Sequence, residues 1–138
     1  MKGYNEIYKS ARDLPLYTAC YRLLEVVDSM LDTLKRDRKH TLGQKLYNTT
    51  LDLFECIRIA NDFPAKREEA LLTLLGKFDN IHTMLKLCNE REYITQTQYL
   101  NLFKPMSSIE RQALGWLNNT RQNARVDSNA TIESASLV

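Results

Sequence analysis

Hydrophobic residues recur along this chain at alternating spacings of three and four, the period of an α-helix with one buried face. Four segments show the pattern, and no segment alternates at period two for long enough to predict a strand. The first two carry Leu16, Cys20, Leu23, Val27, Met30 and Leu34, then Leu42, Leu46, Thr49, Leu53, Cys56 and Ala60. The other two carry Leu71, Leu74, Phe78, Ile81, Leu85 and Cys88, then Tyr99, Leu102, Met106, Ile109, Ala113 and Trp116.

Helix start and stop signals fall between these segments. Pro15 suits the first turn of helix one, and Asn61-Asp62-Phe63-Pro64 separates helices two and three. Thr41 with Gln44, and Thr95 with Gln98, have the spacing of capping boxes that open helices two and four. The connections are therefore short, which predicts an all-α, antiparallel up-down-up-down four-helix bundle. Pro105 leaves two possibilities for helix four, a kink or an interruption followed by a restart.

Length and composition describe one globular domain. The chain has 138 residues, 43% of them apolar and 26% charged. We expect an N-terminal extension at 1–13, the bundle at 14–119 and a tail at 120–138 that lacks periodicity and aromatic residues and should be disordered. With no apolar stretch long enough for a membrane span and no signal peptide, a cytoplasmic protein with reduced cysteines is expected.

Positive charge gathers around the start of helix two, although the formal net charge is only +2. Five bases surround a single acid, Asp37, in the stretch 35–45. In an antiparallel bundle this stretch shares an end with the connection between helices three and four, and such a positive end can bind phosphates. The alternative is a solvated helix end. The candidate nucleic-acid-binding residues are Lys35, Arg36, Arg38, Lys39, His40, Lys45, His82, Lys86 and Arg91.

A second apolar stripe runs beside the core positions of helices one and two. It contains Tyr17, Tyr21, Leu24 and Leu31, then Tyr47, Leu51 and Phe54. Such wide faces either thicken the core or bury against another subunit, and we favour the subunit. The glycines inside helices, Gly43, Gly76 and Gly115, also suggest close backbone approach. The candidate partner interface is Tyr17, Tyr21, Tyr47, Leu51, Phe54 and Arg58.

No catalytic, metal-binding or cofactor-binding pattern is found. Asp79-Asn80-Ile81-His82 is half of a di-iron motif that must occur twice with two further glutamates, and the chain has only two histidines. The cysteines occupy core positions on three different helices, so they are expected to be buried hydrophobic residues. The chain is therefore predicted not to be an enzyme.

These residues carry a resemblance. The run Arg38-Lys39-His40-Thr41-Leu42-Gly43-Gln44, followed by Leu51-Asp52-Leu53, resembles the Avd family, the accessory variability determinant of diversity-generating retroelements. Tyr93-Ile94-Thr95, Gln98-Tyr99 and Leu114-Gly115-Trp116-Leu117 are also similar. The resemblance covers about Leu14 to Arg121. The same superfamily contains four-helix-bundle proteins encoded by intervening sequences of 23S rRNA genes.

The resemblance implies a non-catalytic bundle that assembles into a five-fold ring and binds a reverse transcriptase and its template RNA, or an RNA/DNA hybrid. Through that complex it would support mutagenic cDNA synthesis. Bases at Arg38, Lys39, His82 and Lys86 match positions that tend to be basic in the family. Two alternatives remain, a structural or protein-interaction bundle without a nucleic-acid role and the rRNA intervening-sequence branch.

Overall fold

The computed structural model describes residues 10–136, with side chains as far as Ile132, and confirms an all-α helical bundle without strands in that range. Four long helices form it: α2 (Pro15–Leu31), α4 (Gln44–Asp62), α5 (Arg67–Glu90) and α7 (Phe103–Ser136). The short elements between them are η1 (Ala11–Asp13), α3 (Arg36–Arg38), η2 (Lys39–Gly43), η3 (Pro64–Lys66) and α6 (Gln96–Leu100).

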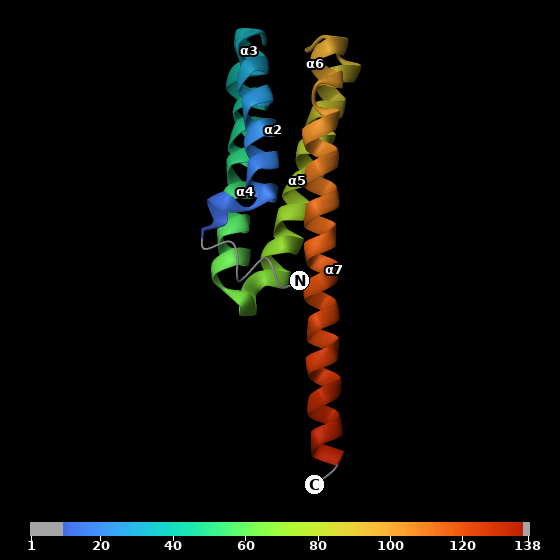
Figure 1. Ribbon diagram of the computed structural model, residues 1–138. Coiled ribbons are helices and arrows are strands. Elements are labelled where there is room, and N and C mark those ends of the chain that lie inside the picture. The colour runs from blue at the N-terminus through green and yellow to red at the C-terminus, as the bar shows by residue number, and fades with distance from the viewer. Residues whose placement is uncertain (1–9, 137–138) are drawn as a thin grey trace.

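The long helices surround one core. Helices α2 and α5 each pack against both α4 and α7, and α3 and α6 lie at the same end of the bundle (Figure 1). The predicted core positions are buried, except that Leu42 and Tyr99 are only partly buried. The alternating spacing of three and four therefore identified the inward face of each long helix.

The bundle begins before the predicted boundary at Leu14. Residues 11–13 form the turn η1, in which Ala11 is buried, and Leu14 has no exposed surface. Pro15 follows at the start of α2, where its missing N–H costs no helical hydrogen bond. Residues 11–13 therefore belong to the bundle and not to the expected N-terminal extension. Residues 1–9 of that extension lie outside the described part of the chain.

The second long helix starts earlier than predicted, and the Thr41 capping box is wrong. Helical backbone begins at Arg36, passes through a π-helical turn at Lys39–Gly43 and continues as α4. Inside this helix the Thr41 hydroxyl donates to the carbonyl of Asp37 at 2.9 Å. A hydroxyl in a helix interior commonly bonds the carbonyl four residues back. The basic residues therefore lie on helical turns and not in a loop.

Gly43 packs tightly where the start of α4 meets the end of α2. A Cβ atom at Gly43 would lie 2.8 Å from Leu31 Cδ2, 3.1 Å from Leu34 Cδ1 and 3.3 Å from the Arg38 carbonyl oxygen. By contrast, a Cβ at Gly76 or Gly115 would meet nothing within 4 Å. Among the three helical glycines only Gly43 lies tightly against a neighbouring segment, and there it meets the side chains of Leu31 and Leu34 and not another helix backbone.

A buried arginine closes the opposite end of the bundle. The carbonyls of the last helical turn lack intrahelical donors, and Arg67, at the start of α5, donates from Nε to the Ala60 carbonyl at 2.7 Å. Its guanidinium also bonds the Asn61 carbonyl and lies 5.5 Å from the ring centre of Trp116 in α7. Burial lowers the pKa of Arg67. One side chain therefore ties α4, α5 and α7 together.

The second predicted capping box is present. The Thr95 hydroxyl accepts from the Gln98 N–H at 3.1 Å, and the Gln98 side chain accepts from the Thr95 N–H at 2.8 Å. The α6 helix that it opens stops at Leu100, and α7 begins at Phe103. Pro105 lies in the first turn of α7, where a proline is tolerated. Helix four is therefore interrupted before the proline.

The predicted disordered tail differs from the structure. Helix α7 continues to Ser136 and projects past the other helices (Figure 1). Every residue in 122–132 is exposed, so no packing holds this part of the helix. After Gly115 the chain contains neither glycine nor proline to end it. The polar composition of the tail correctly predicted that residues 122–132 do not pack into a core. It did not predict that their backbone is helical.

Substitution of the three helical glycines by alanine should give opposite results. Gly43→Ala should destabilise the fold by about 1–2 kcal/mol, because overpacking outweighs the gain in helix propensity. Gly76→Ala and Gly115→Ala should each stabilise it by about 0.5–1 kcal/mol, since a methyl group there meets open space. Urea unfolding of the three variants and the parent checks this, and stabilisation by Gly43→Ala would contradict the close-contact explanation.

Candidate nucleic-acid interface

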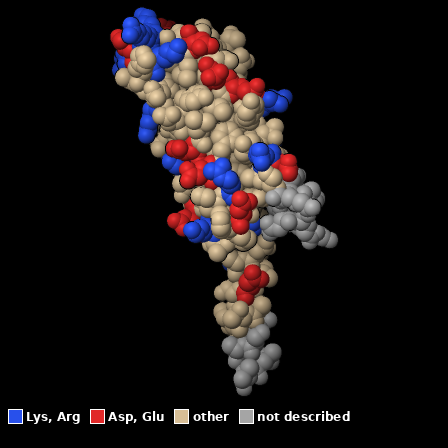
Figure 2. Space-filling view, turned by 90° about the vertical axis from the view of Figure 1, so that its left-hand side faces the viewer, with Lys and Arg blue, Asp and Glu red and all other residues tan. Residues whose placement is uncertain are grey.

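The predicted nucleic-acid-binding residues are all exposed. Lys35, Arg36, Arg38, Lys39 and Lys45, called the basic cluster below, lie on or beside the turns that precede and begin α4. Figure 2 shows Lys and Arg side chains gathered at the α3 end of the molecule, with acidic side chains beside them. Since Asp32, Asp37, Glu90 and Glu92 are also exposed, the surface is positive but locally mixed.

The charges of the basic cluster are not neutralised by intramolecular pairing. Among the described residues no member of the cluster forms an ion pair. Lys86 differs, because its Nζ lies 3.8 Å from Glu90 Oε1, although both side chains are well exposed. Exposed charges without partners remain available to an external anion.

Contacts between helices hold the basic cluster in place. The Arg38 guanidinium lies 4.6 Å from the ring centre of Tyr93, in the connection between α5 and α6. The Gln98 amide donates to the Thr33 hydroxyl at 2.9 Å, which joins α6 to the end of α2. These two contacts bring together connections that are about 60 residues apart in sequence. The basic cluster therefore belongs to a fixed surface.

The connection between α5 and α6 contains Glu92, the only non-glycine residue with a positive φ in the described part of the chain. Glu92 has φ of 58°, directly after the end of α5. The Tyr93 N–H donates to the Cys88 carbonyl at 2.9 Å, as expected for a Schellman ending, in which glycine is usual at the position of Glu92. A left-handed residue costs about 1 kcal/mol. This strained turn directs Tyr93 towards Arg38.

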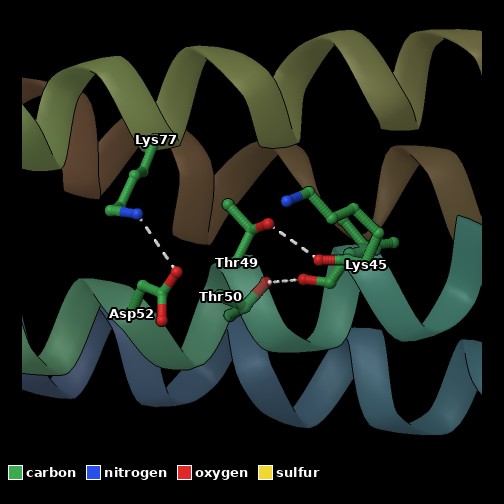
Figure 3. A network of polar contacts seen from close by, with 6 residues as sticks. Lys45, Thr49, Thr50, Asp52 and Lys77 are labelled. Carbon is green, nitrogen blue, oxygen red and sulfur yellow. Dashed lines mark hydrogen bonds and ion pairs between the residues drawn. The ribbon is translucent and has the colours of Figure 1, made fainter.

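Lys45 lies on a different flank of α4 from the aromatic stripe. Figure 3 shows it on the side facing α5, with the Thr49 hydroxyl bonded to the Lys45 carbonyl at 2.7 Å and Thr50 bonded to the Leu46 carbonyl at 2.8 Å. Further along the same flank, Lys77 Nζ pairs with Asp52 Oδ2 at 3.1 Å. The positive surface on this flank thus ends where the Asp52–Lys77 pair begins.

His82 is not adjacent to the basic cluster. It lines a small pocket between α5 and the start of α7, about 13 Å along α5 from Arg91 at a rise of about 1.5 Å per residue. Lys86 is one helical turn nearer the end of the bundle. Lys86 and Arg91 thus lie towards the end of α5 that leads to Tyr93, whereas His82 lines the pocket.

The predicted partner interface forms a partly exposed aromatic face across α2 and α4. The rings of Tyr17 and Phe54 meet edge to face at 4.8 Å between centres. Tyr21 and Leu51 are 49% and 41% exposed, which is high for large apolar side chains. Arg58 lines a hollow with Tyr17. Some members of the second stripe thus thicken the core, whereas Tyr21 and Leu51 face solvent, and burial against another subunit stays a prediction.

Several exposed leucines and an apolar groove were not predicted from the sequence. Leu72 and Leu87 on α5 and Leu114 on α7 are more than 40% exposed. Leu72 and Gly76 are four residues apart, so they share the outward side of α5. A groove of about 680 Å³ also runs between α2 and α7, with Ala19, Val26 and Pro105 in its lining. A second stripe was identified only on helices one and two, so the exposed leucines of α5 and α7 were missed. The groove could not be predicted, because it depends on how α2 and α7 pack.

The cysteines are buried thiols on α2, α4 and α5. Burial raises the pKa of the Cys20 thiol to about 12, and it also raises the pKa values of Cys56 and Cys88. The described residues contain no group of three or more side chains able to hold a metal ion. No described helix is long and apolar enough to cross a membrane.

Comparisons with protein-family models, with curated proteins and with solved structures give no match to this chain. Functional inference therefore depends on the residues themselves and on the family resemblance they carry.

Proposed function

We propose that this protein is a non-catalytic accessory factor of a diversity-generating retroelement, which binds a reverse transcriptase and its template RNA to support mutagenic cDNA synthesis. The observation that carries the proposal is the unpaired basic cluster on the helical turns around Thr41-Leu42-Gly43-Gln44, the most distinctive element of the Avd resemblance. Gly43 gives that element a structural role, since a Cβ there would crowd the side chains of Leu31 and Leu34.

RNA binding would use the phosphate backbone. Lysine and arginine neutralise phosphates and release counterions, a contribution that does not depend on base sequence. The basic cluster, with His40, Lys86 and Arg91, offers exposed cations on one end of a rigid bundle. Such a surface suits an accessory protein that positions RNA, because rigidity keeps the bound strand in one orientation.

Self-association would use the most exposed part of the α2–α4 aromatic face, at Tyr21 and Leu51, and leave the hollow at Tyr17 and Arg58 to the reverse transcriptase. A single four-helix bundle needs one apolar stripe per helix, yet Tyr21 and Leu51 remain largely exposed. Covering this face with a second copy removes apolar area from water, at about 25 cal/mol per Å². A cyclic homo-oligomer, with a pentamer as the expected form, would repeat the basic end around an axis.

The contact with the reverse transcriptase would use aromatic and arginine anchors, which dominate binding at protein interfaces. Tyr17 and Arg58 line one hollow, and Tyr47 lies on the same helix as Arg58. The second candidate function is a protein-interaction bundle without a nucleic-acid role. The exposed leucines of α5 and the α2–α7 groove favour it, since they offer further apolar surface.

The basic cluster should determine RNA affinity and its salt dependence. Replacing Arg38, Lys39 and Lys45 together by alanine should weaken binding at least tenfold and flatten the plot of log affinity against log salt, whose slope is about −0.7 to −0.9 per phosphate contact. The melting temperature should change little, because exposed charges contribute little to stability. Fluorescence anisotropy with a labelled RNA measures the affinities. The matched control replaces Lys66, Arg111 and Arg125, and equal losses in both variants would contradict a specific basic site.

The α2–α4 face should control assembly. Tyr21→Asp places a charge on that face while sparing the core, so it should dissociate the oligomer with helicity unchanged. Light scattering and circular dichroism measure the two properties. Leu72→Asp is the matched control, since Leu72 is 46% exposed on α5. Dissociation by Leu72→Asp alone would place the interface on α5, and a monomeric parent at micromolar concentration would remove the assembly proposal.

The protein should support cDNA synthesis only together with a reverse transcriptase. The purified chain should show no nuclease, deaminase or polymerase activity, because its sequence shows no catalytic motif. Co-expressed with a reverse transcriptase encoded beside its gene, it should co-purify with that enzyme and raise the yield of cDNA from the cognate RNA. Tyr17→Ala combined with Arg58→Ala should reduce co-purification. Failure to bind the enzyme at low salt would favour the protein-interaction alternative.

A further inference from the structure

A small aromatic pocket opens between α5 and the junction of α6 with α7. It encloses about 130 Å³. Its floor belongs to the core, because Phe78, Leu85 and Leu102 are all buried. Its outer lining consists of His82, Tyr99, Phe103, Ser107 and Glu110. The volume is well below the roughly 300 Å³ at which small-molecule sites usually begin, so the pocket suits one ring system.

The interruption of helix four produces the aromatic wall. Because α6 ends at Leu100 and α7 begins at Phe103, the Phe103 ring is directed outward, and half of its surface is exposed. The rings of Tyr99 and Phe103 stand 5.3 Å apart between centres, at an interplanar angle of 70°. Tyr99 thus covers part of Phe103, and the exposed half of the Phe103 side chain is available to a stacking partner.

The polar edge of the pocket favours a nitrogen heterocycle. Ser107, Glu110 and His82 make no side-chain hydrogen bond or ion pair with the rest of the described chain. A carboxylate accepts hydrogen bonds from amino or ring N–H groups, whereas it repels a phosphate. The edge therefore matches the hydrogen-bonding side of a nucleobase and disfavours an anionic group inside the pocket.

The pocket connects to the basic end along α5. His82 is in the pocket lining, Lys86 follows one turn later on the same side, and Arg91 ends the helix. A strand whose phosphates contact Lys86 and the basic end can thus place a base at Phe103. An unpaired base is needed, because the bases of a duplex are stacked within the helix and cannot enter a pocket.

We propose that this pocket binds a single unpaired nucleobase, and that the protein consequently prefers single-stranded RNA to duplex RNA. The inference rests on the proposed RNA-binding function and adds the form of RNA that is recognised. Stacking on aromatic side chains combined with cationic backbone contacts is a general way of binding single strands. The basic cluster supplies most of the salt-dependent affinity, and Phe103 supplies a contribution that does not depend on salt.

The test compares Phe103→Ala with Phe63→Ala in the full chain. Both residues are exposed phenylalanines, at 50% and 55%, but Phe63 lies at the opposite end, after α4. The probe is a single-stranded, adenine-rich RNA of about 12 nucleotides containing 2-aminopurine, a length within the range that one binding domain covers. Phe103→Ala should weaken binding about tenfold with the salt slope unchanged, and it should abolish the fluorescence change caused by stacking. Phe63→Ala should behave like the parent.

A third variant, Phe103→Leu, separates stacking from apolar burial. Leucine keeps much of the apolar volume without an aromatic face, so it should also lose the 2-aminopurine signal, and its circular dichroism spectrum verifies folding. Equal binding of single-stranded and duplex RNA by the parent, or full affinity in both Phe103 variants, would overturn the pocket assignment while leaving the basic-cluster result intact. Absence of any RNA binding would overturn both proposals.

Discussion

The close approach of Gly43 to the end of α2 determines how the basic end of this bundle is built. With no Cβ, the π-helical turn packs directly on Leu31 and Leu34, so α2 and α4 are joined through Asp32–Lys35 without a long loop. The basic residues then occupy helical positions and acquire fixed directions. Arg38 reaches Tyr93 for this reason, and that contact ties the basic cluster to the far side of the bundle.

Two identical Thr-x-x-Gln patterns adopt different structures, and the residues that precede them explain the difference. Both Thr41 and Thr95 stand three residues before a glutamine. At Thr95 the chain arrives in an extended conformation after the left-handed Glu92, so the hydroxyl is free to cap the new helix. At Thr41 the chain is already helical from Arg36, and the hydroxyl bonds a carbonyl of the preceding turn. A capping pattern predicts a helix start only where the residues before it are not themselves helical.

The inward faces and the exposed bases were predictable, because periodicity and charge are local properties of the sequence. The aromatic pocket was not, since its lining comes from α5, α6 and α7 and exists only after helix four is interrupted. Arg67 was equally hidden. An arginine next to two glutamates at a helix start suggests a solvated surface, yet its guanidinium is buried against Trp116 and the end of α4. Tertiary contacts of this kind override the ordinary preference of charged residues for solvent.

The π-helical turn at Lys39–Gly43 lets the helix hold one extra residue without changing the direction of the positive charge. An α-helix turns by about 100° for each residue, and a π turn holds one residue more than an α turn. The extra residue is thus absorbed within the turn, so Arg36–Arg38 and the core stripe of α4 keep the orientation that an uninterrupted α-helix would give them. Removing one residue from this turn should convert it to α-helix and leave Arg38 beside Tyr93. Two chains that differ by one residue here can therefore offer the same charged surface to a partner.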